Sequence, residues 1–241
     1  MAKTLLETIG HRLGQKIAQA RNAFDLMGGT EEDSLRAEIR LGRDLAAALL
    51  ERIPLVEENK STKFAAEIGC WLAASVKEKK LPFSVRVTAE REPNALALPG
   101  GFVFVSWPLL EMCQGQRDEI AFVIAHEMAH IVRRHTLDRI LKDAALSLLL
   151  RQASGRNAAG TWLSKAGRQL LGAAYSSDDE LEADAFAAAL VGTAGGDALA
   201  GERLLERLTQ RDQTVGIPGN YFGTHPPLAE RVANLRAKRQ G

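Results

Sequence analysis

The sequence contains little cysteine, and the two residues present are not arranged for cross-linking or for metal binding. Cys70 and Cys113 are the only cysteines among 241 residues, and they form no CxxC pair. Their spacing indicates neither a disulfide framework nor a cysteine-based zinc site. Because free cysteines are usually buried, we expect both thiols to be packed in the interior.

Long apolar runs are also missing. The best one, Ala144–Leu150, is far shorter than the roughly 20 residues that a bilayer-spanning helix requires. Residues 1–14 contain one lysine but no continuous apolar stretch of the kind found in signal peptides. We therefore expect no transmembrane span and a cytoplasmic location if Met1 is the native start. A periplasmic or membrane-associated location is the alternative if a signal precedes this sequence.

Neither sign of charge is in excess. The formal net charge is +1, and 46% apolar with 25% charged residues is ordinary for a globular protein. The composition therefore predicts no general attraction for nucleic acid or for an acidic membrane. A chain of this length can bury a substantial core without covalent cross-links.

Periodic apolar residues predict helices in the first part of the chain. Thr30 can cap a helix over residues 31–53, which Pro54 ends. Its apolar residues recur near a 3.6-residue period, which predicts a buried face formed by Leu35, Ile39, Ala46, Leu49 and Ile53. A second helix is expected to begin after Ser61.

The only β pattern lies in the middle of the chain. Residues 83–87 alternate in polarity like a strand, and residues 94–106 predict a hairpin around a Pro-Gly-Gly turn. From Arg117 we expect one long helix to Leu150, and then shorter helices near 161–174, 178–191, 197–209 and from Leu228. This order predicts one predominantly helical α+β domain over residues 1–241, with an N-terminal helical section (1–60) and a core (61–241).

Histidine is scarce, yet three of the five histidines fall within residues 121–135. His126 and His130 lie one helical turn apart, separated by about 40° around the axis, so their imidazoles can converge on one zinc ion. Glu127 lies on the adjoining surface, where it can act as general base toward a zinc-activated water. This arrangement is the HExxH motif of zinc peptidases.

A buried helix that merely carries histidines is the alternative. The surrounding residues are apolar on every side, and a buried glutamate between two histidines is costly unless it has a partner, which a zinc ion would supply. His135 follows His130 by five residues and points about 140° away on one continuous helix. We therefore expect His135 to be structural or on the surface and to lie off the metal.

A catalytic zinc site needs a third protein ligand and an open position for water. The acidic segment Ser176–Phe186 is the main candidate. Glu180 and Asp184 are four residues apart and face the same way, so Glu180 could bind zinc while Asp184 accepts a hydrogen bond from a ligand imidazole. Spacing alone leaves Glu182 and Asp179 open as the ligand.

Four segments together resemble the HtpX and CaaX-type prenyl-protein endopeptidases, which are zinc metalloproteases of metallopeptidase family 48 within the gluzincins. In chain order these segments are Asn94–Gly101, His126–His130, Glu180–Asp184 and Thr224–Val232. The resemblance extends over residues 81–235 and implies a gluzincin-type fold with a substrate edge strand. It implies that one zinc ion is bound by His126, His130 and Glu180. It also implies Glu127 as catalytic base and Asp184 as the carboxylate behind a ligand.

The resemblance also assigns a role to residues 94–101. It implies that an extended peptide pairs by main-chain hydrogen bonds with this segment. Its residues are Asn94, Ala95, Leu96, Ala97, Leu98, Pro99, Gly100 and Gly101. Relatives often have phenylalanine at position 96, so the leucine could alter a specificity pocket. A simple hairpin turn accounts for the two glycines as well.

His225 and Arg231 belong to the last of the four segments. By resemblance His225 lies beside the zinc, either donating a hydrogen bond to the oxyanion of the tetrahedral intermediate or occupying the fourth zinc position in a latent enzyme. Arg231 is expected to anchor the segment by pairing with nearby acids. An ordinary surface arginine is the alternative.

Together these patterns predict a zinc-dependent metalloendopeptidase that hydrolyses extended or unfolded polypeptides, with protein quality control as a role. The expected partner is a peptide or an unfolded protein, and no nucleic acid. The absence of membrane spans argues against prenylated substrates. A proteolytically silent zinc-containing chaperone or peptide-binding module is the main alternative, and a non-peptide hydrolase is a third.

Overall fold

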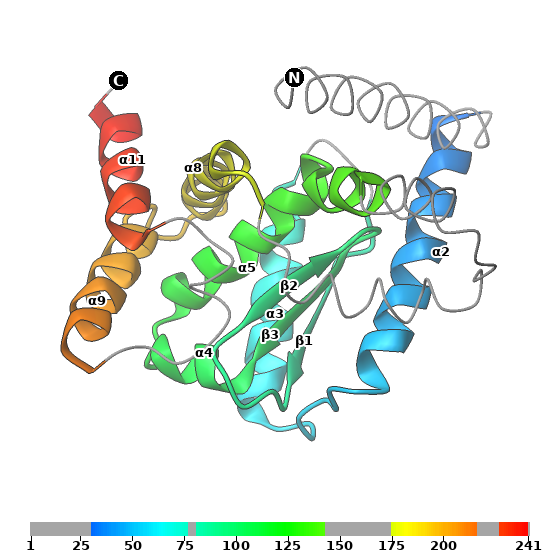
Figure 1. Cartoon of the computed structure of the whole chain (residues 1–241), viewed down its shortest axis with the longest axis horizontal. Helices are drawn as coiled ribbons and strands as arrows, with labels where there is room; N and C mark the ends of the chain where they lie inside the picture. The colour runs from blue at the N-terminus through cyan, green and yellow to red at the C-terminus, as the bar shows by residue number, and fades with distance from the viewer. Residues whose placement is uncertain (1–29, 77–80, 143–174, 216–226, 241) are drawn as a thin grey trace, which may run out of the picture.

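The structure of the chain is a computed structural model in which residues 30–76, 81–142, 175–215 and 227–240 are described. Among the described residues, the three strands of one sheet follow one another along the chain, with helices before and after them (Figure 1). The elements are α2 (Glu31–Leu50), α3 (Lys60–Ala73), β1 (Ser84–Thr88), β2 (Ala95–Leu98), β3 (Phe102–Ser106), α4 (Trp107–Met112), α5 (Arg117–Val132), α8 (Ser177–Thr193), α9 (Ala200–Val215) and α11 (Leu228–Gln240). The predominantly helical α+β fold expected from the sequence is confirmed.

Helix α5 runs through the centre of the molecule (Figure 1). Every residue from Glu119 to Val132 is buried, because α3, α8, α9 and the sheet all pack against this helix. The all-round apolar sequence of this segment is therefore explained by its central position. A polar side chain on α5 needs a partner inside the protein.

The sheet has the strand order β1-β3-β2, with β1 parallel and β2 antiparallel to β3. The expected hairpin is confirmed, since β2 and β3 are joined through a turn at Gly100 (φ +79°) and Gly101 (φ +97°). Both glycines adopt backbone conformations that other residues rarely tolerate. Strand β2 lies at one edge of the sheet, and no other described strand pairs with it.

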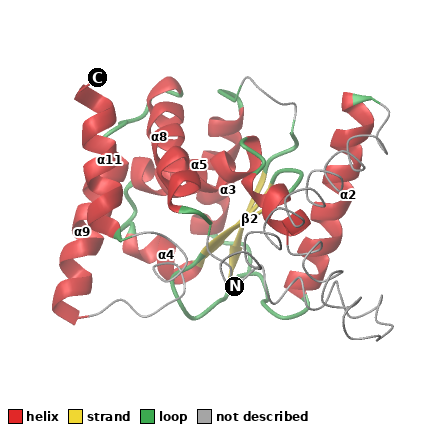
Figure 2. Ribbon diagram, turned by 45° about the horizontal axis from the view of Figure 1, so that its top comes forward, coloured by secondary structure: helices red, strands yellow, loops and turns green. Residues whose placement is uncertain are grey.

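The two faces of β2 differ because large and small side chains alternate along it. Leu96 and Leu98 pack in an apolar cluster with Leu45 and Leu49 of α2, and Figure 2 shows β2 lying between α5 and α2. Ala95 and Ala97 belong to the main core on the opposite face, together with residues of α5 such as Ile124, Ala125 and Met128. Small side chains on this face let α5 approach the edge strand closely.

The backbone N–H and C=O groups of β2 also alternate in direction. The amide of Ser106 donates to the carbonyl of Asn94 (2.8 Å), so Asn94, Leu96 and Leu98 occupy the positions that bond to β3 in an antiparallel pair. It follows that the N–H and C=O groups of Ala95 and Ala97 are directed away from β3, toward the outer edge of the sheet.

Helix α2 begins as expected, because Thr30 Oγ1 accepts a hydrogen bond from the Asp33 amide (3.2 Å). The expected apolar stripe is wrong in its first half, where Leu35 and Ile39 are only half-buried. The buried positions there are Ser34, Glu38 and Gly42.

These residues are polar or small because α2 packs there against the backbone of the turn after β2. Glu38 Oε1 accepts a hydrogen bond from the Gly100 amide (3.4 Å), and a Cβ at Gly42 would lie 1.8 Å from the Pro99 carbonyl oxygen. Backbone, and not apolar side chains, thus determines which residues fit on this part of α2.

One continuous helix from Arg117 to Leu150 is wrong. Helix α5 ends at Val132, Arg134 takes a left-handed conformation (φ +62°), and helix resumes at residues 135–142. No glycine or proline lies at this break, so the sequence carries no stop signal. The expected helices near 178–191 and 197–209 correspond to α8 and α9, whereas 161–174 lies outside the described residues.

The two cysteines differ in exposure. Cys113 is buried, and burial raises the pKa of its thiol to about 12. Cys70 is exposed, so the expectation that both thiols are packed is wrong for this residue, which lies on the outer face of α3. Among the described helices, none combines the length and the apolar character that crossing a bilayer demands.

The close approach of α2 to the turn predicts that Gly42→Ala destabilises the protein. Alanine is favoured over glycine in a helix by about 1 kcal/mol, but overpacking costs about 1–3 kcal/mol or more. Here the obstacle is a backbone carbonyl and not a movable side chain. We expect a net loss on the order of 1 kcal/mol, measured as a lower urea midpoint at unchanged slope.

Arg43→Ala is the matched control, because Arg43 is the exposed neighbour on the same helix. Its free energy of unfolding should change by no more than about 0.5 kcal/mol. A Gly42→Ala protein as stable as the wild type would contradict the described packing of α2.

Candidate metal centre

Three side chains from two helices come together at the middle of α5. His126 and His130 of α5 and Glu180 of α8 are each 0% exposed, and their candidate ligand atoms all lie within 4.8 Å of one another. Helix α8 can approach α5 closely because Ala183 and Ala187, one and two turns after Glu180, are small and buried. The histidine pair and the distant acidic segment are therefore joined in one site.

The separations between the donor atoms fit a single metal ion. His126 Nε2 lies 3.2 Å from His130 Nε2 and 3.3 Å from Glu180 Oε2, and His130 Nε2 lies 3.6 Å from Glu180 Oε1. Tetrahedral zinc with bonds of about 2.05 Å would place its ligand atoms about 3.3 Å apart. Two imidazoles and one carboxylate are also a ligand set of catalytic zinc sites, in which a fourth position is left for water.

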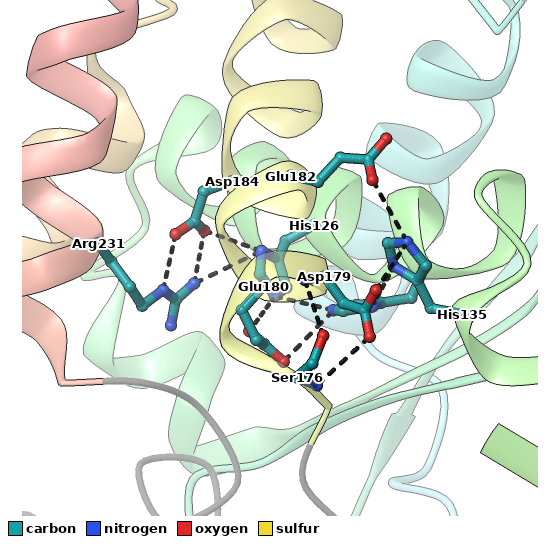
Figure 3. Close-up of polar contacts among 9 residues, drawn as sticks. His126, His135, Ser176, Asp179, Glu180, Glu182, Asp184 and Arg231 are labelled. Atoms are coloured by element: carbon teal, nitrogen blue, oxygen red, sulfur yellow. Dashed lines mark hydrogen bonds and ion pairs between the residues drawn. The ribbon is translucent and has the colours of Figure 1, made fainter. Parts of the chain in front are cut away.

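The other two acids considered as ligands lie elsewhere. Glu182 is half-exposed and pairs with Arg133 (3.0 Å). Asp179 completes a capping box with Ser176 at the start of α8. Both carboxylates approach His135 and not the histidine pair (Figure 3).

Glu127, the residue after His126 on α5, is a buried carboxylate outside the three-residue cluster. Its side chain is 2% exposed, and within the described part of the chain its Oε1 makes no hydrogen bond. Burial raises the pKa of this carboxyl to about 7. An unpaired buried carboxylate oxygen is costly, and a water positioned by a metal ion beside it would supply the missing donor.

A buried ion pair orients His126 from behind. Asp184 Oδ1 lies 2.9 Å from His126 Nδ1, and Arg231 binds both oxygens of Asp184, at 2.8 Å from Nε and 2.7 Å from Nη2 (Figure 3). Arg231 and Asp184 are both 0% exposed. Arg231 thus joins α11 to α8 through a buried ion pair and is not a surface arginine.

The charges around His126 favour a cation on this ring. Burial alone would raise the pKa of Asp184, but Arg231 holds it well below the usual range for a carboxyl. Burial would lower the pKa of His126, but hydrogen bonds to Asp184 and Glu180 outweigh it and raise the pKa to about 9. Acceptors that hold a proton on this ring so firmly would also favour a bound metal cation.

His135 is outside the three-residue cluster, but the prediction that it points away from His130 is wrong. It is 9% exposed, and its Nδ1 lies 3.1 Å from His130 Nδ1, because the break at Arg134 replaces the continuous helix on which it would point away. Sequence reasoning also missed Tyr175, whose ring stacks on His130 with centroids 3.8 Å apart. No spacing rule marked Tyr175, although it directly precedes the acidic segment.

The remaining candidates are placed only in part. His225 lies outside the described residues, as does the segment that precedes it. Residues 94–101 form β2 and the following turn, next to α5. The Leu96 side chain faces α2 and not α5, so a substrate pocket formed by this side chain would lie on the face away from the histidine pair.

The sequence profile of peptidase family M48 matches residues 62–239. The chain therefore belongs to this family, and its three-ligand cluster is in keeping with a metallopeptidase.

Individual relatives agree with this assignment. The chain is 33% identical over 159 residues (64% of this chain, 46% of the relative) to the mitochondrial metalloendopeptidase OMA1 of Schizosaccharomyces pombe. It is 29% identical over 197 residues (77% of this chain, 40% of the relative) to a putative beta-barrel assembly-enhancing protease of Vibrio cholerae. The chain thus spans less than half the length of these two relatives. The crystal structure of S. mikatae Ste24p aligns with a TM-score of 0.46 at 18% identity, over 96% of this chain and 63% of that one.

The buried pair of Asp184 and Arg231 predicts strong energetic coupling. Removing one partner leaves an uncompensated buried charge, so Arg231→Leu should lower the free energy of unfolding by about 3–5 kcal/mol. Asp184→Asn should also destabilise the protein, and the double variant should lose clearly less than the sum of the two. Urea unfolding of chelator-treated protein measures this without a contribution from metal.

Arg236→Leu on the same helix is the control. Arg236 is half-exposed and pairs with Glu202 at 2.7 Å, and such surface pairs contribute about 0–1 kcal/mol. If the effects of Asp184→Asn and Arg231→Leu simply add, the two residues are not the coupled pair that the geometry indicates.

Proposed function

We propose that this chain is a zinc-dependent metalloendopeptidase that hydrolyses peptide bonds in extended or unfolded polypeptides. The observation that supports this most is Glu127, a buried carboxylate whose Oε1 makes no hydrogen bond within the described residues. It lies in the sequence between His126 and His130, which together with Glu180 could hold a metal ion. A protein that only stores zinc has no need for such a carboxylate.

The roles of the side chains follow from their positions. His126, His130 and Glu180 would hold one zinc ion, which when bound supplies a Lewis acid that polarises the scissile carbonyl and acidifies water. Glu127 removes the proton from the attacking water and returns it to the leaving amine. Asp184 keeps the His126 ring turned toward the metal.

An extended peptide would bind along the outer edge of β2. The side chains of β2 are packed on both faces of the sheet and are at most 9% exposed, so a substrate can approach this strand only at its edge. The outward N–H and C=O groups of Ala95 and Ala97 would pair with the substrate main chain. A folded protein cannot offer a free main chain of this kind, which favours unfolded substrates and a role in protein quality control.

We further propose that α2 belongs to the same domain as the metal centre. It contributes Leu45 and Leu49 to a cluster shared with β2, and Glu38 binds the turn that follows β2. A helix so placed supports the substrate strand from behind.

Glu127→Gln should abolish peptide hydrolysis without loss of zinc. A general base contributes about 10²–10⁴-fold to rate, and glutamine has nearly the same shape but cannot accept the proton. Cleavage of an unstructured protein such as casein and the zinc content per chain measure the two properties on the same sample.

Glu111→Gln makes the same chemical change at an exposed position of α4 and should leave cleavage unchanged. Unaltered cleavage by Glu127→Gln would refute the proposed base. A wild type that binds zinc and unfolded peptides tightly, but shows no zinc-dependent turnover, would establish the silent peptide-binding module instead.

Ala97→Pro should selectively impair long substrates. Proline removes an N–H that faces the outer edge and not β3, a position at which edge strands tolerate it. We expect kcat/KM for an unfolded protein to fall at least about tenfold, because one main-chain hydrogen bond to the substrate is lost. The zinc content should stay unchanged. Equal effects of Ala97→Pro and Ala97→Ser would show that this amide does not bind substrate.

A further inference from the structure

The two ligand histidines are supported by different chemical groups. His126 Nδ1 faces the carboxylate of Asp184 at 2.9 Å. His130 Nδ1 faces another imidazole, with His135 Nδ1 at 3.1 Å. Ligand histidines usually donate their second ring N–H to a carboxylate, a carbonyl or a water, so the partner of His130 is unusual and calls for its own explanation.

We propose that His135 is a positioning residue for His130, because its Nδ1 accepts the hydrogen bond that fixes which nitrogen of His130 faces the metal. This inference rests on the proposed function, since it requires a metal ion at the site.

The number of protons on the two rings determines which nitrogen is the acceptor. Only one of the two facing Nδ1 atoms can carry the hydrogen that joins them. Because His130 Nε2 points toward His126 and Glu180, it is the atom that would bind metal, and the neutral ring then carries its proton on Nδ1. His135 must therefore present a bare Nδ1 as the acceptor.

The far side of His135 fits this assignment. With Nδ1 bare, a neutral His135 carries its proton on Nε2, which faces Asp179 Oδ1 at 3.5 Å and Glu182 Oε2 at 3.6 Å (Figure 3). Both groups are acceptors. The carboxylates thus favour the tautomer of His135 that His130 needs.

The plane of the His130 ring is fixed by a second contact. Tyr175 stacks on it with an interplanar angle of 11°, and the guanidinium of Arg139 lies 4.1 Å from the centre of the tyrosine ring. Stacking restricts tilt of the imidazole, while His135 restricts its rotation. Together they leave His130 one orientation.

The backbone break after α5 makes this arrangement possible. Arg134 adopts a left-handed conformation (φ +62°), which costs a non-glycine residue about 1 kcal/mol or more. Its guanidinium lies 3.8 Å from the buried carboxylate of Glu38 on α2. The strained residue thus sits directly before His135 and is in contact with the helix that supports the substrate strand.

Two substitutions at position 135 distinguish the contribution of the hydrogen bond to zinc affinity from that of side-chain packing. Asparagine offers Oδ1 close to where histidine has Nδ1, whereas leucine fills similar space without an acceptor. We expect His135→Leu to weaken zinc affinity about 10–100-fold, the usual effect of losing such a partner, and His135→Asn to stay within about threefold of the wild type. Competition with a chromophoric chelator measures the dissociation constants.

Thermal unfolding of the chelated proteins reports any packing loss separately. Wild-type affinity in His135→Leu, or equal weakening in both variants, would overturn the positioning role while leaving the peptidase proposal intact. A wild type that binds no zinc would overturn both.

A measurement on the unmutated protein does not depend on how the variants fold. Nitrogen-15 NMR of the imidazoles in the zinc-loaded chain distinguishes protonated from bare ring nitrogens, and the chain has only five histidines to assign. The expected result is a proton on Nδ1 of His130 and on Nε2 of His135. A proton on Nδ1 of His135 would contradict the proposal.

Discussion

The site depends on one constraint: charged groups at the centre of α5 are removed from water and must be compensated inside the protein. The effective cost is several kcal/mol per buried ion. Arg231 compensates the buried charge of Asp184, and Asp184 in turn faces His126. The Nε2 atoms of His126 and His130 and the carboxylate of Glu180 converge on one point. A dication bound there would compensate the buried charge of Glu180. Glu127, the residue after His126 on α5, is also buried and keeps an oxygen that makes no hydrogen bond within the described part of the chain.

The rest of the fold follows from bringing these groups together. Helix α5 is buried on all sides because one face packs on α8 and its other faces pack on α3, α9 and the sheet. Alanines on both α8 and β2 let backbones approach α5 closely. Helix α11 supplies Arg231 from the C-terminal end of the chain. The metal centre and the edge strand are thus held by the same central helix.

Much of this could be predicted because it depends on short-range periodicity. Four-residue spacing predicted the His126–His130 pair and the shared face of Glu180 and Asp184, and the glycines after β2 predicted the hairpin. Other features depend on tertiary contacts. Glu38 and Gly42 replace an apolar stripe because α2 meets a backbone turn. His135 reaches His130 through a helix break that neither glycine nor proline marks.

The proposed enzyme requires that Glu180, fifty residues from the histidine pair, completes the metal site. The most direct test of this requirement is the zinc dissociation constant of Glu180→Gln, measured beside the wild type on chelator-treated protein. We expect one zinc ion per wild-type chain. The variant should lose more zinc affinity than the roughly 10–100-fold that follows when a residue hydrogen-bonded to a ligand is replaced. An unchanged dissociation constant would contradict this expectation, because the carboxylate ligand would then be another residue.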